Sequence, residues 1–375
     1  MKDTVTVFII SAKPDPRINK RIELTAQYSK VHLIYWNRSG LRNCYTNSNC
    51  IIHEINIKTG DSCLKRFPHY HSFSREAMNE LCRIDCNIIH VQGLDMLIIA
   101  CKYSQKHPVK IIYEVADLPH LVIDKPSNPV WYFIQKYIRR LEEKCLKKVD
   151  LLIVTSPRFV DIRYHDLISN DKILYFANVP DKKLFVNYDK RKDSCHNFTV
   201  SYIGVVRYKQ EMKTFLACAK NSKANFLIAG FETDGNEIEI QAKKISNVTW
   251  YGEYNFNLEG SKLYNMSDVI YAVYDTNQLN VRIALPNKLY EAVFCELPII
   301  VAKNTYLAEI VEEWGIGVAV DSRSVNELDA AIEKLRNDRD FYNRIVNNCR
   351  QHKRDTELSY YNSLLMSYVK QKLLS

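Results

Sequence analysis

Residues 280–300 read NVRIALPNKLYEAVFCELPII, and we interpret the rest of the chain outward from them. A polar turn leads into a short predicted helix that carries Lys288 and Glu291, and the apolar run 297–302 predicts a buried strand. We expect Asn287 to cap the amides at the start of this helix, a place that favours anions. Glu291 can accept hydrogen bonds from hydroxyl groups, while Lys288 supplies a positive charge. The stretch therefore predicts a site for a nucleoside diphosphate that carries a sugar.

These residues resemble the C-terminal nucleotide-sugar site of GT-B glycosyltransferases, most nearly the family 4 type that builds bacterial surface polysaccharides. The matching pattern is Pro-Asn-Lys-Leu-Tyr-Glu. The resemblance implies that Glu291 binds the nucleotide ribose. Ile283 stands where the family carries a first acid. The resemblance also implies that the sugar and the phosphates meet a loop made of Pro286, Asn287, Lys288 and Leu289.

A second match follows the predicted strand 198–203. The resemblance implies that Gly204 and Arg207 hold the diphosphate together with a nearby lysine, for which Lys209 is a candidate, and that Tyr251 lies near the base. Negative charge grows on the diphosphate as the sugar bond breaks, and a guanidinium group can meet it with two hydrogen bonds. We therefore expect catalytic roles for Arg207 and Lys288, with no metal site and no cofactor.

The chain has 375 residues, which is enough for two domains. Its content of 46% hydrophobic and 25% charged residues is typical of a soluble globular protein, and its net charge of +9 favours anionic partners. No nucleic-acid recognition module is present, so we expect no nucleic-acid binding. The eleven cysteines are odd in number and scattered, which indicates reduced thiols. With neither a signal peptide nor an apolar stretch of roughly 20 residues, the predicted location is the cytoplasm.

Strands and helices alternate along both halves, and this rhythm predicts parallel sheets wound by helices. The resulting fold class is α/β, and with the resemblance it is GT-B: two Rossmann-like doubly wound domains facing a central cleft. We expect an acceptor domain at 1–180, a polar linker at 181–197, a donor domain at 198–355 and a C-terminal helix at 356–375 that can cross back to the first domain. The predicted strands are 4–11, 31–36, 51–57, 88–91, 109–114, 151–155, 198–203, 225–229, 248–250, 269–273, 298–302 and 317–320.

Polar residues follow several predicted strands of the first half, where ligands of parallel sheets gather. Together with the resemblance, they predict that the acceptor contacts Asp15, Arg17, His90, Asp95 and Asp117. Asp117 could be a general base on a sugar hydroxyl, or a residue that only shapes its loop. His90 is better explained as a hydrogen-bonded structural residue. We place His69 and His71 in a polar loop.

Residues 130–148 predict an amphipathic helix with an apolar stripe and a basic side. Such a helix can lie on an anionic membrane, which would place the protein at the inner face of the membrane. The alternative is that the stripe packs on the protein's own sheet and the basic side faces water.

We expect a glycosyltransferase that moves a hexose or related sugar from a nucleotide-diphosphate donor to a hydroxyl of a polysaccharide or lipid-linked glycan precursor, as in capsule or exopolysaccharide synthesis. The resemblance implies retention of anomeric configuration. Three alternatives stay open: an inverting transferase with Asp117 as base, a non-catalytic GT-B partner subunit of another transferase, and a sugar-nucleotide epimerase on the same fold.

Overall fold

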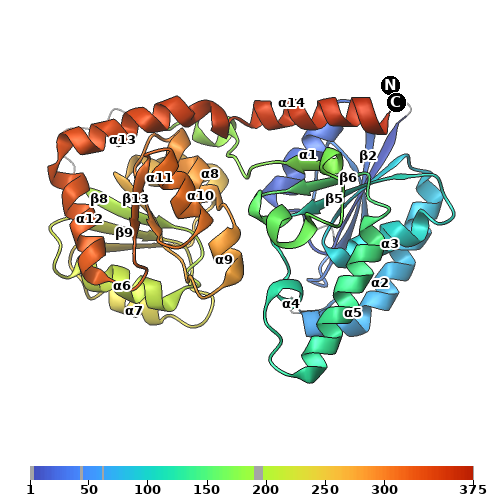
Figure 1. Cartoon of the computed structure of the whole chain (residues 1–375), viewed down its shortest axis with the longest axis horizontal. Helices are drawn as coiled ribbons and strands as arrows, with labels where there is room; N and C mark the ends of the chain where they lie inside the picture. The colour runs from blue at the N-terminus through green and yellow to red at the C-terminus, as the bar shows by residue number, and fades with distance from the viewer. Residues whose placement is uncertain (1–3, 43–44, 61–62, 190–196, 375) are drawn as a thin grey trace. The chain divides into compact units, whose positions relative to one another are not determined.

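The computed structural model describes residues 4–42, 45–60, 63–189 and 197–374. The chain divides into two compact units. Unit 1 comprises Met1–Phe176 and Asn362–Ser375, and unit 2 comprises Ala177–Tyr361. Each unit has its own parallel sheet and its own covering helices (Figure 1).

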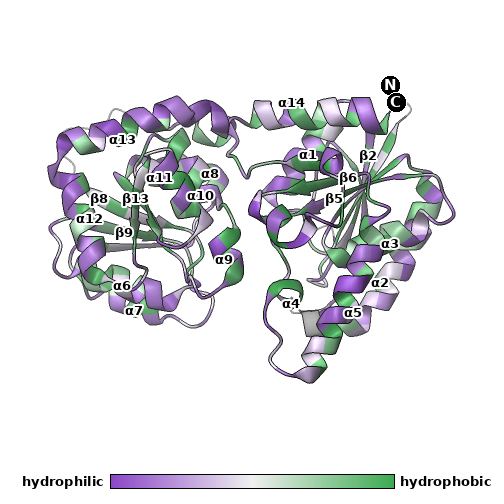
Figure 2. Cartoon of the chain, in the orientation of Figure 1, coloured by the Kyte–Doolittle hydropathy of each residue, from purple (hydrophilic) through white to green (hydrophobic). Residues whose placement is uncertain are grey.

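Unit 1 is built on a seven-stranded sheet in the order β3-β2-β1-β4-β5-β6-β7. Its strands are β1 (Val5–Ile10), β2 (Lys30–Asn37), β3 (Ile51–Asn56), β4 (Ile88–Gln92), β5 (Lys110–Val115), β6 (Leu151–Val154) and β7 (Ile173–Tyr175). Strands buried on both faces consist of nearly continuous apolar residues, and Figure 2 shows the hydrophobic residues concentrated on them. The direction of winding reverses between β1 and β4, which are neighbours, and ligands of such sheets bind beside this reversal.

The helices of unit 1 are α1 (Pro16–Thr25), α2 (Cys63–Ile84), α3 (Leu94–Tyr103), α4 (His120–Ile123) and α5 (Pro129–Leu146). Helix α2 corrects the prediction of a polar loop around His69 and His71, because the helix runs through Pro68. Burial explains this, since Phe73 is fully buried and stacks on Trp36 at a ring distance of 4.8 Å. Packing of one helix face outweighs the hydrogen bond that Pro68 cannot donate.

Unit 2 contains a six-stranded parallel sheet in the order β10-β9-β8-β11-β12-β13. Its strands are β8 (Thr199–Ile203), β9 (Asn225–Ala229), β10 (Val248–Gly252), β11 (Val269–Ala272), β12 (Ile299–Ala302) and β13 (Gly317–Val320). The winding reverses between β8 and β11, which pair directly. A binding site is therefore expected outside the carboxyl ends of these two strands.

The helices of unit 2 are α6 (Lys209–Ala219), α7 (Glu237–Ala242), α8 (Phe256–Asn265), α9 (Leu279–Ile283), α10 (Asn287–Phe294), α11 (Tyr306–Glu313), α12 (Val325–Asn337) and α13 (Arg339–Gln351). The expected capping role of Asn287 is wrong. Pro286 occupies the N-cap position without a side-chain hydrogen bond, and Asn287 is already helical. A helical residue cannot aim its side chain back at the first amides as an N-cap does.

The last helix, α14 (Leu358–Tyr368), begins in unit 2, and the residues from Asn362 onward belong to unit 1. Leu365 and Val369 are buried, and the hydroxyl of Tyr368 donates to the carbonyl of Asp150 at 2.9 Å. The C-terminal residues therefore contribute to the packing of unit 1.

The predicted linker 181–197 lies partly outside the described residues, and its described part contains a short 3-10 helix, Lys182–Phe185. All eight cysteines whose state the structure describes are free thiols. Among the described helices, none combines the length and the apolar character needed to cross a bilayer.

Candidate functional site

Glu291 and Lys288 lie at the start of α10, next to a tyrosine from α8. Glu291 is 4% exposed, and its Oε2 accepts hydrogen bonds from the hydroxyl of Tyr264 and from Nζ of Lys288, each at 2.5 Å. Burial and the negative charge of Glu291 raise the pKa of Tyr264 well above its usual value, so this phenol stays a hydrogen-bond donor. Both recorded bonds end on Oε2, which leaves Oε1 to accept from a ligand.

Aromatic rings surround this pair of charges. Nζ of Lys288 lies 5.4 Å from the ring centre of Phe256 and 5.5 Å from that of Tyr264. Burial, together with the charge of Glu291, raises the pKa values of Tyr254 and Tyr274. The ammonium group is thus held between ring faces that attract cations, beside a carboxylate that fixes its position.

The segment after β8 carries Gly204, Arg207 and Lys209. A side chain at Gly204, whose φ is +152°, would meet nothing within 4 Å, so the backbone faces open space there. Arg207 is exposed, and its guanidinium makes no ion pair or side-chain hydrogen bond with another residue that the structure describes. Lys209 is instead engaged, because its Nζ lies 3.4 Å from Glu232 and also donates to the carbonyl of Asp234. Arg207 is therefore the better placed of the two cations to meet an anionic ligand.

Shared tyrosines connect Arg207 with Glu291. Burial raises the pKa of Tyr202, next to which Tyr208 and Tyr254 act in the same direction and the charge of Arg207 acts against them. Tyr254 in turn feels Glu291. The guanidinium and the carboxylate therefore flank one group of tyrosines at the carboxyl edge of the unit 2 sheet, at the reversal between β8 and β11.

Tyr251 has a partner of its own. It ends β10, and its hydroxyl donates to Oε1 of Glu259 at 2.5 Å, while Lys262 stacks over its ring. The predicted contact between Tyr251 and a base stays a prediction. Tyr264 and Tyr254, by contrast, are part of the site, yet the sequence interpretation did not select them. Their only signal was their position on or before a helix that follows a predicted strand.

Replacing Tyr264 with phenylalanine is expected to lower the free energy of unfolding by about 1.5–3 kcal/mol, because it removes a buried hydrogen bond to a charged group. Urea unfolding measures the change. Tyr251→Phe is the matched control, since it removes a hydrogen bond of the same length to a partly exposed glutamate, and water replaces that bond. Equal losses in both variants would contradict the interpretation of Glu291 as a buried carboxylate held by Tyr264.

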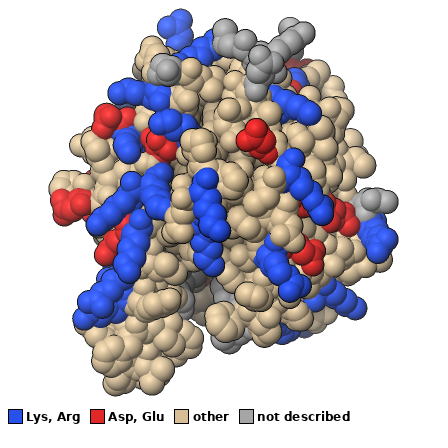
Figure 3. Space-filling view, turned by 90° about the vertical axis from the view of Figure 1, so that its right-hand side faces the viewer, with Lys and Arg blue, Asp and Glu red and all other residues tan. Residues whose placement is uncertain are grey.

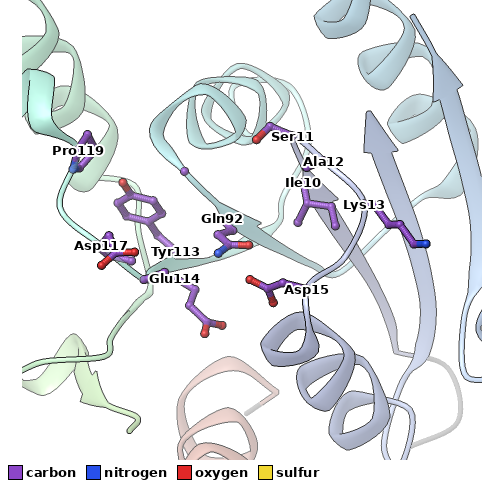
Figure 4. Close-up of a pocket in the computed structure, with 13 residues that line it drawn as sticks. Ile10, Ser11, Ala12, Lys13, Asp15, Gln92, Tyr113, Glu114, Asp117 and Pro119 are labelled. Atoms are coloured by element: carbon purple, nitrogen blue, oxygen red, sulfur yellow. The ribbon is translucent and has the colours of Figure 1, made fainter. Parts of the chain in front are cut away.

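Unit 1 contains a cavity of about 340 Å³ at the carboxyl ends of β1, β4 and β5. Figure 4 shows the polar ends of Gln92 and Asp15 facing one another, while the side chain of Lys13 points away from them. The cavity lies at the reversal of the unit 1 sheet. Its lining consists of Ile10, Ser11, Ala12, Lys13, Asp15, Gln92, Gly93, Tyr113, Glu114, Val115, Ala116, Asp117 and Pro119.

Of the predicted acceptor residues, Asp15 and Asp117 line this cavity. Asp15 also caps α1, since Oδ1 accepts from the amide of Ile18 at 2.8 Å. Arg17 stands beside it, with Nη2 3.9 Å from Oδ2 of Asp15. Nε and Nη1 of Arg17 are buried without a hydrogen-bond partner among the described residues. Buried guanidinium nitrogens without partners are costly, and an anionic or hydroxyl-rich ligand would satisfy them.

His90 and Asp95 lie elsewhere. His90 is 2% exposed, stacks on Phe8 and does not line the cavity, so a direct contact between His90 and an acceptor does not fit its burial. Its role as a hydrogen-bonded structural residue does fit. Asp95 begins α3 and pairs with Arg66 at 3.5 Å.

A buried charge network supports the floor of the cavity. Glu114 accepts from both Nε and Nη2 of Arg21 at 3.2 Å, and Nε2 of His90 lies 3.0 Å from its Oε2. Burial alone would raise the pKa of Glu114, but the charge of Arg21 and the hydrogen bond from His90 outweigh it and hold the pKa well below its usual value. Arg21 lies over the ring of Phe176, 3.3 Å from its centre. Its pKa is lowered by burial, although a guanidinium still remains charged at neutral pH.

The search for metal-binding groups covered the described residues, and it found no cluster of three or more histidine, cysteine, aspartate or glutamate side chains suited to a metal ion. The positive charges of the unit 2 site come from Arg207 and Lys288.

Comparison with known proteins agrees with this geometry. The family model described as "Glycosyl transferases group 1" matches residues 189–352, which include the whole predicted donor site. No curated protein matches the sequence.

Several solved structures are similar over nearly the whole chain. Sucrose-phosphate synthase from Thermosynechococcus elongatus has a TM-score of 0.75 and 16% identity, over 99% of both chains. Anabaena HepE in complex with UDP-glucose has a TM-score of 0.69 and 12% identity, over 97% of this chain and 99% of HepE. WaaG, described as a glycosyltransferase involved in lipopolysaccharide biosynthesis, has a TM-score of 0.68 and 11% identity, over 97% of this chain and 98% of WaaG. The predicted fold of two Rossmann-like domains is thereby confirmed.

Proposed function

Because this chain is a glycosyltransferase with the GT-B fold, whose residues 189–352 match the group 1 family, we propose that it transfers a sugar from a nucleoside-diphosphate donor to a hydroxyl of a glycan or lipid-linked precursor. Unit 2 binds the donor and unit 1 binds the acceptor. The titles of the HepE structures, which name UDP and UDP-glucose, support a nucleotide-sugar donor. WaaG's role in lipopolysaccharide synthesis supports a cell-surface glycan, such as a capsule or exopolysaccharide, made in the cytoplasm.

The observation that carries the proposal is the edge of the unit 2 sheet where Arg207 and Glu291 flank the same tyrosines. In the proposed complex, Oε1 of Glu291 accepts from the ribose hydroxyls, and the guanidinium of Arg207 binds the diphosphate. The backbone at Gly204 leaves room for a phosphate. As the bond to the sugar breaks, electrons move onto the diphosphate, and Arg207 and Lys288 stabilise that charge without a metal ion.

Ile283 bears on whether the protein turns over its donor. It is 6% exposed at the end of α9, so an apolar side chain packs where the resembling family has an acid. A non-catalytic partner subunit could tolerate that change, but Arg207, Lys288 and Glu291 are all present in one region. We therefore favour an enzyme.

Two measurements test the proposal. A thermal-shift screen with nucleotide sugars should find a donor that raises the melting temperature, since a ligand that binds only the folded state stabilises it. That donor should then be consumed by the isolated protein in the presence of an acceptor. Binding without consumption, for every acceptor tried, would favour the partner subunit over the enzyme.

Replacing Asp117 with asparagine separates the two stereochemical courses. In the retaining course that we favour, the departing phosphate accepts the acceptor proton, so kcat should fall by less than about tenfold. Loss of a true general base would cost about 10²–10⁴-fold. The product anomer, followed by NMR, provides the second readout. A product of opposite configuration, together with a large loss in Asp117→Asn, would establish the inverting course instead.

A further inference from the structure

The first two turns of α5 expose an unusual number of large apolar side chains. Phe133 is 66% exposed and Tyr137 68%. This group, which we call the α5 tip, consists of Val130, Trp131, Tyr132, Phe133, Ile134 and Tyr137. Water contact at so many neighbouring apolar side chains is unfavourable, and contiguous exposed patches of this kind mark interaction sites.

The α5 tip is not the face by which the helix packs on unit 1. The buried residues of α5 are Gln135, Glu142, Cys145 and Leu146. The apolar stripe expected from the sequence, with Val130, Ile134 and Tyr137 on it, was one alternative for packing on the sheet, and the structure leaves its first half exposed. Packing near the tip uses polar groups instead, since Gln135 donates to the carbonyl of Asp124 at 2.7 Å.

Basic residues continue the exposed face beyond the tip. Phe133, Tyr137, Arg140, Lys144 and Lys147 recur every three or four residues, so they share one side of the helix. Lys125 and Lys136 add two more exposed cations near the tip. Figure 3 shows the same arrangement, a lobe of uncharged side chains at the lower end of the molecule with Lys and Arg side chains above it.

We propose that the α5 tip inserts into an anionic lipid bilayer and that the adjoining basic residues bind the lipid head groups. Trp and Tyr prefer the membrane–water interface, and Lys and Arg are attracted to anionic lipid within about 10 Å. Arg140 lies within about that distance of the tip, because six residues of helix span roughly 9 Å. A second copy of the chain fits the surface less well, since a two-fold contact would place two basic flanks against one another.

The position of the tip gives this contact a use, and here the inference rests on the proposed lipid-linked acceptor. Asp117 and Pro119 line the unit 1 cavity, and α4 follows directly after them. Helix α5 holds that segment in place, because Nε of Arg139 donates to the carbonyl of Val122 at 2.8 Å. A bilayer that holds the tip would therefore lie at a fixed distance from the cavity, within unit 1 alone.

Vesicle co-sedimentation of the full chain tests the proposal. We expect binding to phosphatidylcholine vesicles that contain about one third phosphatidylglycerol, and at least tenfold weaker binding to pure phosphatidylcholine. The double variant Phe133→Ser/Tyr137→Ser should bind anionic vesicles at least tenfold more weakly. Lys136→Gln/Arg140→Gln should lose roughly fivefold per charge, and high salt should abolish the difference between this variant and the wild type.

Val186→Ser/Leu258→Ser is the matched control, because these unit 2 side chains are 78% and 79% exposed and lie outside the α5 tip. It should bind vesicles like the wild type. The proposal is overturned if Phe133→Ser/Tyr137→Ser also binds like the wild type, or if sedimentation velocity shows a dimer that this variant abolishes while no vesicle binding occurs. Vesicle binding needs no sugar donor, so it can succeed even where the proposed transfer fails. Conversely, consumption of the donor with a water-soluble acceptor should be unchanged in Phe133→Ser/Tyr137→Ser.

Discussion

Replacing Glu114 with glutamine is expected to lower the free energy of unfolding of unit 1 by about 3–5 kcal/mol. The reason is burial, since the side chain of Glu114 is 0% exposed and that of Arg21 is 1% exposed. Without the carboxylate, the guanidinium of Arg21 keeps its charge inside the protein with no counter-charge in contact, and neither water nor Phe176 can replace the lost ion pair. Urea unfolding monitored by circular dichroism measures the loss.

Lys110→Gln is the control for removing a charge as such, because the ion pair between Lys110 and Asp150 is partly exposed. It should change the free energy of unfolding by no more than about 1 kcal/mol. The double variant Arg21→Met/Glu114→Gln removes both buried charges and should recover much of the stability that Glu114→Gln loses. A double variant that is no more stable than Glu114→Gln would contradict the idea that an unpaired buried charge causes the loss.

The same pair predicts how stability depends on pH. The folded-state pKa of Glu114 lies below its ordinary value of 4.5, so the unfolded chain takes up the proton first as the pH falls. The stabilisation by ionised Glu114 is therefore complete above about pH 5 and is lost progressively below that, toward the folded-state pKa. The stability difference between the wild type and Glu114→Gln should shrink as the pH is lowered from 7 to 3.

Replacing Arg207 with alanine is expected to lower kcat/KM for the donor by about 10²–10³-fold, the usual cost of removing one group that stabilises charge in a transition state. Arg207 is exposed at the carboxyl edge of the unit 2 sheet, on the segment that follows Gly204. Arg207→Lys keeps the charge but loses the two-pronged hydrogen bonding, so it should recover only part of the activity. Steady-state kinetics with the identified donor measures each loss.

Lys209→Ala provides the comparison that tests this assignment. Lys209 is already paired with Glu232, so its removal should cost less than about tenfold. If both variants lost the same activity, the diphosphate would be held by the whole segment rather than by Arg207. If Arg207→Ala were as active as the wild type, the proposed donor site would be wrong. Melting temperatures should match the wild type in both variants, because neither side chain is buried.

Much of the fold could be predicted from the pattern of residues. Alternating apolar strands and amphipathic helices indicated parallel sheets, and the structure confirms two of them. The misses have local causes. Strand β7 spans only three residues, Ile173–Tyr175, which is too short for a pattern to emerge. The start of α2 was missed because Pro68 is a strong breaker in the sequence, whereas burial of Phe73 keeps the helix intact.

The sequence by itself determined the fold class, the family resemblance and the presence of Arg207, Lys288 and Glu291 on segments that follow strands, since these depend on order and spacing along the chain. Tertiary structure decided the rest. It placed Tyr264 on the carboxylate of Glu291, closed Arg21 onto Glu114 across 93 positions of sequence, and left the first turns of α5 exposed. Contacts between residues so distant in the chain depend on how sheets and helices pack, and no local pattern encodes that packing.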